Sequence, residues 1–125
     1  MKNLLPLFII VIVACSSPES KNTNFLLQPE DFSKKIESGA TILDVRSVEE
    51  YAGGHISGSL NMDFNSPGFK ENVMMLDKSK TYAVYCASGV RSGKAGEIMR
   101  QNGFTSVYTL AGGTKAWSEK GLPLE

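Results

Sequence analysis

The sequence predicts one α/β domain built on a mostly parallel sheet, and three observations indicate this fold class. From Phe25 onward, short apolar segments that suit buried strands alternate with longer segments that have an apolar helical face. The segment Thr81–Tyr85 is apolar and aromatic without interior Gly or Pro, as strands buried on both faces are. The 125 residues leave room for one domain of about 100 residues with a single core.

In the first half of the domain, turn and capping residues delimit the expected elements. Pro29 suits the first turn of a helix, and Gly39 suits its end. Ser47 and Glu50 have the spacing of a capping box, which predicts a short helix through Tyr51. The strands expected around these two helices are residues 25–27, 40–45 and 60–62, and a turn at residues 53–59 precedes the last of them.

In the second half, the alternation of helices and strands continues. Ser66 with Pro67 can begin a helix. The apolar side chains on one face of that helix are Phe69, Val73 and Leu76. The remaining expected elements are strands at 81–85 and 106–110, a helix at 92–102 that Gly103 ends, a Gly112-Gly113 turn, and a last helix from Thr114 to Gly121.

Cys86 lies where the strand at 81–85 ends, on a tight loop that leads into a helix. The N–H groups of such a loop and of the helix N-terminus form a nest that binds anions. A thiolate is stabilised there, so we expect the pKa of Cys86 to fall below its usual value of about 8.5. Gly89 tolerates the positive φ that such a loop needs, and Arg91 adds a fixed positive charge. The alternative is that Cys86 is a small buried apolar residue, as free cysteines often are.

The first 14 residues have the pattern of an export signal. Lys2 precedes an apolar run that is interrupted only by Pro6 and is too short to span a bilayer. The run ends in Ile12-Val13-Ala14-Cys15, which resembles the lipobox of bacterial lipoproteins. That resemblance implies cleavage before Cys15 and acylation of this residue, and each buried CH₂ of the acyl chains contributes about 0.8 kcal/mol to membrane binding. A plain signal peptide and a core strand are the alternatives.

Residues 16–24 contain no large apolar side chain, which is typical of a flexible tether. The expected organisation is therefore a signal peptide at 1–14, a lipidated cysteine and polar tether at 15–24, and a folded domain at 25–125. The expected location is the periplasmic side of the cell envelope, with the protein bound to a membrane through the lipid on Cys15.

Charge and cysteine content limit the possible functions. Lys plus Arg and Asp plus Glu both total 13, so no basic excess indicates a nucleic-acid partner. If Cys15 is acylated, Cys86 is the only free cysteine of the mature protein, which excludes an intramolecular disulfide and a two-cysteine redox mechanism. No zinc-binding pattern is present, and we expect neither a metal nor another cofactor. We expect a monomer.

Four motifs, in order along the chain, resemble the signatures of a single-domain rhodanese. They are Asp44-Val45-Arg46, Gly54-His55-Ile56-Ser57-Gly58-Ser59, Cys86-Ala87-Ser88-Gly89-Val90-Arg91-Ser92, and Leu110-Ala111-Gly112-Gly113 with Trp117 and Gly121-Leu122-Pro123. The resemblance covers residues 25–125 and implies a doubly wound sheet of about five strands flanked by helices. It also implies sulfurtransferase chemistry, in which a thiolate takes a sulfane sulfur from a donor, becomes a persulfide and passes the sulfur to a thiophilic acceptor.

The resemblance implies roles for the residues of the cysteine loop. Cys86 would be the nucleophile and persulfide carrier. Arg91 would bind an anionic donor or form a salt bridge that holds the loop. The loop residues that would surround the sulfur and supply N–H donors are Ala87, Ser88, Gly89, Val90, Arg91 and Ser92.

Supporting roles are expected at the other motifs. Asp44 is expected to fix neighbouring loops rather than to accept a proton, and Arg46 to act likewise by pairing with Glu49 or Glu50. His55, the only histidine, and Trp117 are expected to be structural, His55 in the turn and Trp117 in the core.

The length of the loop separates related activities. Cys86 to Arg91 spans six residues, the length associated with sulfur substrates, whereas the related dual-specificity phosphatases and arsenate reductases use one residue more. Ala87 stands where the family often has Arg, so the expected donors include thiosulfate, a protein persulfide, a polysulfide or another sulfur compound. The expected acceptor is a thiol or a cyanide-like nucleophile. Two other classes stay open, namely a noncatalytic rhodanese-like binding module and a single-cysteine thiol redox protein.

Overall fold

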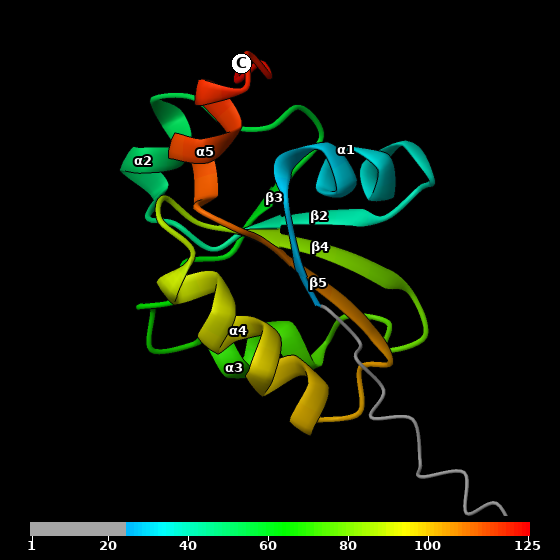
Figure 1. The fold of residues 1–125 in the computed structure, drawn as a ribbon. Coiled ribbons are helices and arrows are strands. Elements are labelled where there is room, and N and C mark those ends of the chain that lie inside the picture. Colours follow the sequence, from blue (N-terminus) through cyan, green and yellow to red (C-terminus); the bar gives the residue numbers. More distant parts are fainter. Residues whose placement is uncertain (1–24) are drawn as a thin grey trace, which may run out of the picture.

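Five parallel strands form a sheet at the centre of the structure (Figure 1). The computed structural model describes residues 25–125, so the expectations for the signal peptide, for Cys15 and for the tether lie outside the described residues. The sheet has the order β1-β5-β4-β2-β3. The strands are β1 (Leu26–Leu27), β2 (Thr41–Asp44), β3 (Leu60–Asn61), β4 (Thr81–Tyr85) and β5 (Ser106–Leu110).

Helices cover both faces of this sheet (Figure 1). They are α1 (Pro29–Glu37), α2 (Val48–Ala52), α3 (Phe69–Met74), α4 (Val90–Gln101) and α5 (Gly113–Glu119). Helices α1, α2 and α5 lie on one side and α3 and α4 on the other, which confirms the predicted doubly wound arrangement with a parallel five-stranded sheet. Within residues 25–125, none of the helices has the length and apolar character needed to cross a membrane.

The central strand β4 divides the core into two clusters because its side chains alternate between the two faces of the sheet. Tyr82, Val84 and Cys86 pack on the side of α3 and α4. Ala83 and Tyr85 pack on the side of α1 and α5. Both faces of β4 are therefore buried, which explains why its sequence is apolar without alternation.

The capping box predicted for the short helix α2 is present. The Ser47 hydroxyl accepts the N–H of Glu50 at 3.1 Å, and the Ser47 N–H donates to the Glu50 carboxylate at 3.3 Å. Both interactions satisfy N–H groups that have no partner within the helix. The orientation of the Glu50 side chain is thus set by the first turn of α2.

Three helices begin at different residues from those expected. Helix α3 begins at Phe69 rather than at Ser66, because the Ser66 carbonyl accepts the Phe69 N–H at 3.1 Å in a turn that precedes the helix. Helix α4 begins at Val90, two residues early, because Gly89 at φ 102° already accepts the first helical hydrogen bond from Gly93. Helix α5 runs over Gly113–Glu119 rather than from Thr114 to Gly121.

Candidate active site

The cysteine loop lies at the carboxyl end of β4, the central strand. In open α/β sheets this edge is where ligands bind. Cys86 follows the last residue of β4, and Gly89 at φ 102° turns the chain into α4 (Figure 1). The strand thus fixes the start of the loop and the helix fixes its end, so the backbone of residues 86–89 is held at both sides.

The Cys86 sulfur is buried and surrounded by polar groups of its own loop. The Gly89 N–H donates to Sγ at 3.0 Å, and the thiol donates to the Ser92 Oγ at 3.4 Å. Burial raises the pKa of the Cys86 thiol. The Ser92 hydroxyl and the N–H groups of Ser92, Gly89 and Ser88 together lower it by a larger amount. The pKa of Cys86 therefore lies below its ordinary value, which confirms the expected direction.

The Ser92 hydroxyl has one hydrogen and two neighbours that could accept it. In the thiol state this hydrogen is donated to the Gly89 carbonyl at 3.3 Å while Oγ accepts the S–H of Cys86. When the thiol loses its proton, the hydroxyl can rotate and donate to the thiolate instead. Ser92 thus has a partner in both protonation states of Cys86.

Arg91 connects the loop to α2. Its Nη1 lies 2.7 Å from Glu50 Oε1, and its Nη2 lies 3.0 Å from Oε2, which is a bidentate arrangement. The hydrogen bonds from Arg91 are the main reason that the pKa of Glu50 is lowered to about 2, although partial burial acts in the opposite direction. Of the two roles expected for Arg91, the geometry is that of the salt bridge that holds the loop.

Asp44 and Arg46 form a buried ion pair at the end of β2. Arg46 Nη2 lies 2.7 Å from Asp44 Oδ2 and donates to the Gly54 carbonyl as well, and Arg46 Nε contacts both carboxylate oxygens. The expected pairing of Arg46 with Glu49 or Glu50 is therefore wrong. The physical reason is burial: Arg46 is enclosed beside the equally buried Asp44, whereas Glu50 lies on α2 with Arg91.

This pair connects three parts of the chain on the carboxyl side of the sheet. Through Gly54 it reaches the turn after α2. The Asn61 side chain donates to the carbonyls of both Asp44 and Arg46, which ties β3 to the same point. Asp44 thus has the environment of a residue that fixes neighbouring loops, as expected from the sequence.

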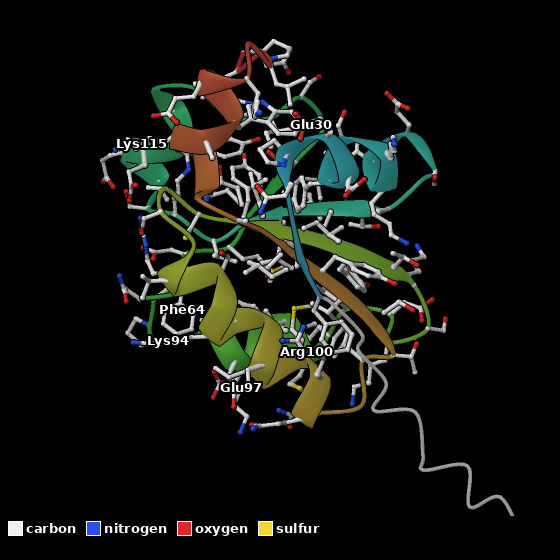
Figure 2. All side chains as sticks on the ribbon, viewed as in Figure 1. Glu30, Phe64, Lys94, Glu97, Arg100 and Lys115 are labelled. Carbon is white, nitrogen blue, oxygen red and sulfur yellow. The ribbon has the colours of Figure 1, made fainter. Side chains whose placement is uncertain are left out.

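The start of α5 contacts the backbone of the cysteine loop, and the sequence did not lead us to expect this contact. The Thr114 N–H donates to the Cys86 carbonyl at 3.0 Å, and the Lys115 N–H to the Ala87 carbonyl at 3.4 Å. A Cβ on Gly113 would overlap the backbone of Cys86 and Ala87. The Gly112-Gly113 pair was the available signal, because adjacent glycines permit a close approach between backbones as well as a turn. Figure 2 shows Lys115 on α5.

His55 and Trp117 occupy structural positions, as expected. The His55 ring stacks on Tyr51 with 3.8 Å between centroids, and its Nδ1 lies 2.9 Å from the Tyr51 carbonyl. The His55 backbone exchanges two hydrogen bonds with Glu125. Trp117 is buried, and its indole N–H donates to the Pro123 carbonyl.

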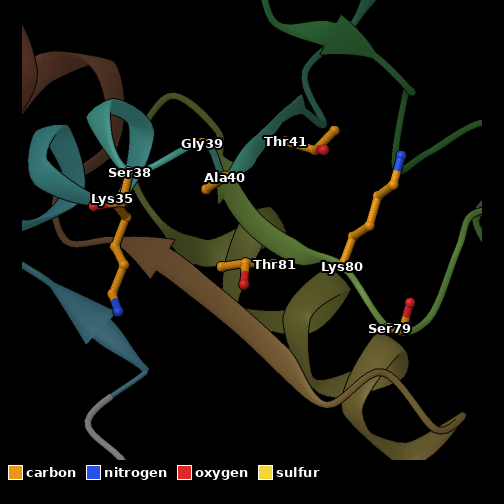
Figure 3. A pocket seen from close by; sticks show the side chains of 8 residues that line it. All are labelled: Lys35, Ser38, Gly39, Ala40, Thr41, Ser79, Lys80 and Thr81. Carbon is orange, nitrogen blue, oxygen red and sulfur yellow. The ribbon is translucent and has the colours of Figure 1, made fainter.

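A hollow of about 460 Å³ lies at the opposite edge of the sheet from Cys86 (Figure 3). Its lining includes Thr41 and Thr81, which begin β2 and β4, whereas Cys86 follows the end of β4. This hollow is therefore separate from the cysteine loop. Among residues 25–125, no three His, Cys, Asp or Glu side chains are grouped so that they could hold a metal ion.

Fold and loop together define a class of α/β protein in which an N–H-lined loop presents a cysteine at the carboxyl edge of a parallel sheet. Comparison with known families specifies the class further. The chain belongs to the rhodanese-like domain family, whose model matches residues 28–120.

Relatives and solved structures agree with this assignment. The chain is 40% identical over 81 residues to the uncharacterized protein YqhL of Bacillus subtilis, covering 65% of this chain and 63% of YqhL. It is 35% identical over 91 residues to the thiosulfate sulfurtransferase GlpE of Pseudomonas paraeruginosa, covering 73% of this chain and 81% of GlpE. A crystal structure of a rhodanese-related protein from Thermoplasma volcanium superposes with a TM-score of 0.72 at 33% identity, covering 79% of this chain and 95% of that one.

Proposed function

We propose that the protein is a sulfurtransferase that moves a sulfane sulfur from a donor to a thiophilic acceptor through a persulfide on Cys86. The single observation on which the proposal rests is the position of the Cys86 sulfur, buried within a loop whose N–H groups and Ser92 hydroxyl lower the pKa of the thiol. Relatives named thiosulfate sulfurtransferase support the same reaction class.

The first half-reaction loads the cysteine. The Cys86 thiolate attacks the sulfane sulfur of a donor R–S–SH, a new S–S bond forms to Sγ, and the S–S bond of the donor breaks. Its electron pair leaves with R–S⁻, so the products are the Cys86 persulfide and a thiolate. No net oxidation or reduction occurs.

The second half-reaction transfers the sulfur from the Cys86 persulfide to the acceptor. A thiolate or cyanide acceptor attacks the outer sulfur of the persulfide, the S–S bond to Sγ breaks, and the Cys86 thiolate returns with the electron pair. The N–H of Gly89 and the hydroxyl of Ser92 stabilise this leaving thiolate. The same groups therefore assist both halves of the cycle.

Intact mass of the purified protein tests the proposal. After exposure to thiosulfate or to an organic persulfide, we expect a cyanide-labile gain of about 32 Da, the mass of one sulfur atom, that Cys86→Ser abolishes. Absence of an adduct with every donor, together with a thiol that alkylates no faster than free cysteine, would favour a noncatalytic rhodanese-like binding module. A gain of oxygen rather than sulfur would favour a thiol redox protein.

We also propose that the protein is exported and held at the periplasmic side of the cell envelope by a lipid on Cys15. The support is the apolar run that ends in Ile12-Val13-Ala14-Cys15. Expression with a labelled fatty acid in a bacterium tests it, and the expected result is label on the unaltered protein and none on Cys15→Ser. Incorporation that persists in Cys15→Ser would contradict the proposal.

A further inference from the structure

Arg91 is the only charged side chain in the loop from Cys86 to Ser92. Both nitrogens at the end of its guanidinium contact the two carboxylate oxygens of Glu50, at 2.7 and 3.0 Å. Hydrogen bonds to Glu50 raise the pKa of Arg91 most, and the charges of Cys86 and, more weakly, of Asp63 raise it as well. The charge that a loop arginine would offer to an anionic substrate is therefore already offset by carboxylates of the protein.

The position of Glu50 is fixed independently of the loop. Its side chain accepts the Ser47 N–H in the capping box of α2, and its backbone N–H donates to the Ser47 hydroxyl. Because the pKa of Glu50 is lowered to about 2, the carboxylate is ionised at neutral and mildly acidic pH. Glu50 is thus a permanent counter-charge held at a set place beside the loop.

Sulfane sulfur donors differ in the charge next to the transferred sulfur. Thiosulfate is a dianion, and its leaving group is sulfite. An organic persulfide R–S–SH has no charge at the reacting atoms beyond its own ionisation. When its arginine is already paired, the loop offers the dianion no extra attraction from that side chain.

Resting on the proposed function, we propose that Glu50 is a specificity-determining positioning residue, which pairs with Arg91 and thereby favours organic persulfides over thiosulfate as sulfur donors. The transfer is that of the first half-reaction above, in which the donor leaves as R–S⁻. With thiosulfate the same bond changes release sulfite, SO₃²⁻, and the sulfane sulfur remains on Cys86.

The test compares two donors, thiosulfate and the persulfide of 2-mercaptoethanol, with the full chain. Glu50→Gln removes the negative charge that faces Arg91 but preserves the start of α2, because glutamine also completes a capping box. We expect the ratio of kcat/KM for thiosulfate to kcat/KM for the persulfide to rise about tenfold, the effect of one hydrogen bond to a charged group. Glu49→Gln removes the neighbouring exposed carboxylate and is the matched control, which should leave the ratio unchanged.

Two further variants show whether the change acts through Arg91. In Glu50→Gln/Arg91→Gln the gain should disappear, because the freed cation is gone. Arg91→Gln alone leaves Glu50 unpaired beside the loop, and the ratio should then fall below that of the unaltered protein. Lys115, whose N–H contacts the loop, is present in every variant, so its charge cancels in these comparisons.

The outcomes separate this inference from the proposed function. An unchanged donor ratio in Glu50→Gln, or an increase that persists in the double variant, overturns the inference while the persulfide on Cys86 still forms. An unchanged ratio in Arg91→Gln overturns it as well. Failure of the unaltered protein to accept sulfur from either donor contradicts the proposed function itself.

Discussion

The Gly89 N–H points at the Cys86 sulfur across 3.0 Å, although Gly89 lies in the left-handed region at φ 102°. A residue with a Cβ is strained in that conformation. The backbone that delivers this hydrogen bond therefore depends on glycine. Among the described residues, Ser92 is the only one whose side chain forms a hydrogen bond with the Cys86 sulfur.

Ser92→Ala should make the Cys86 thiol less reactive at neutral pH. The Ser92 hydroxyl is the largest of the influences that lower the pKa of Cys86, so its removal raises that pKa and reduces the thiolate fraction. We expect alkylation by iodoacetamide at pH 7 to slow about tenfold, as for loss of one hydrogen bond to a charged group.

The pH profile of this alkylation identifies the cause. The midpoint should move to higher pH in Ser92→Ala, and Ser118→Ala, which removes an exposed hydroxyl on α5, should leave it in place. A rate that falls equally at all pH values, with an unmoved midpoint, would mean that Ser92 acts on access to the sulfur rather than on its ionisation.

The ion pair between Glu50 and Arg91 should contribute to stability only above acidic pH. The folded-state pKa of Glu50 is about 2, below its ordinary value of 4.5, so its contribution is complete above about pH 4.5 and is lost as pH falls toward 2. The two side chains are 37% and 24% exposed, so the contribution is at most about 1 kcal/mol because water screens the pair.

Urea unfolding of the unaltered protein and of Glu50→Gln at several pH values measures the contribution of the ion pair. The difference in unfolding free energy should be present at pH 7 and should vanish as pH approaches 2. A difference that stays constant over this range would show that the glutamine weakens α2 in some way unrelated to the carboxylate charge.

The sequence pattern alone predicted those elements whose bounds are determined by a single local signal. The strand at 81–85 and the strand at 106–110 have the predicted bounds, because apolar runs without Gly or Pro end there at turn residues. The capping box of Ser47 and Glu50 is likewise a local pattern, and it is present. The position of Cys86 between strand and helix followed from the same signals.

Pairing between side chains could not be predicted in the same way. Arg46 has Glu49 and Glu50 within helical reach in the sequence, but burial beside Asp44 determines its partner. Glu50 instead meets Arg91, 41 residues away, because the end of β2 and the end of β4 lie side by side in the sheet. Such contacts depend on strand order, which a single sequence does not specify.

Gly113→Ala should displace the cysteine loop. The new Cβ would overlap the backbone of Cys86 and Ala87, and Gly113 is also at φ 60°. Backbone strain alone costs about 1–3 kcal/mol, so we expect a larger loss in unfolding free energy together with slower persulfide formation.

Gly121→Ala separates the two contributions. Gly121 has a similar φ of 75°, but its Cβ would have no neighbour within 4 Å. It should therefore show the strain cost without loss of Cys86 reactivity. Equal effects of the two variants on unfolding free energy and on the alkylation rate of Cys86 would mean that the close approach of Gly113 does not position the cysteine loop.

Arg46→Met should be strongly destabilising, because it leaves the buried carboxylate of Asp44 without a partner. Removal of one member of a buried pair costs about 3–5 kcal/mol, whereas an exposed pair contributes about 1 kcal/mol or less. Lys34→Met, which breaks the exposed contact between Lys34 and Asp31, is the matched control. Thermal and urea unfolding of the two variants measures the difference. If Arg46→Met lost no more stability than Lys34→Met, the turn at Gly54 and strand β3 would not depend on the ion pair at the end of β2.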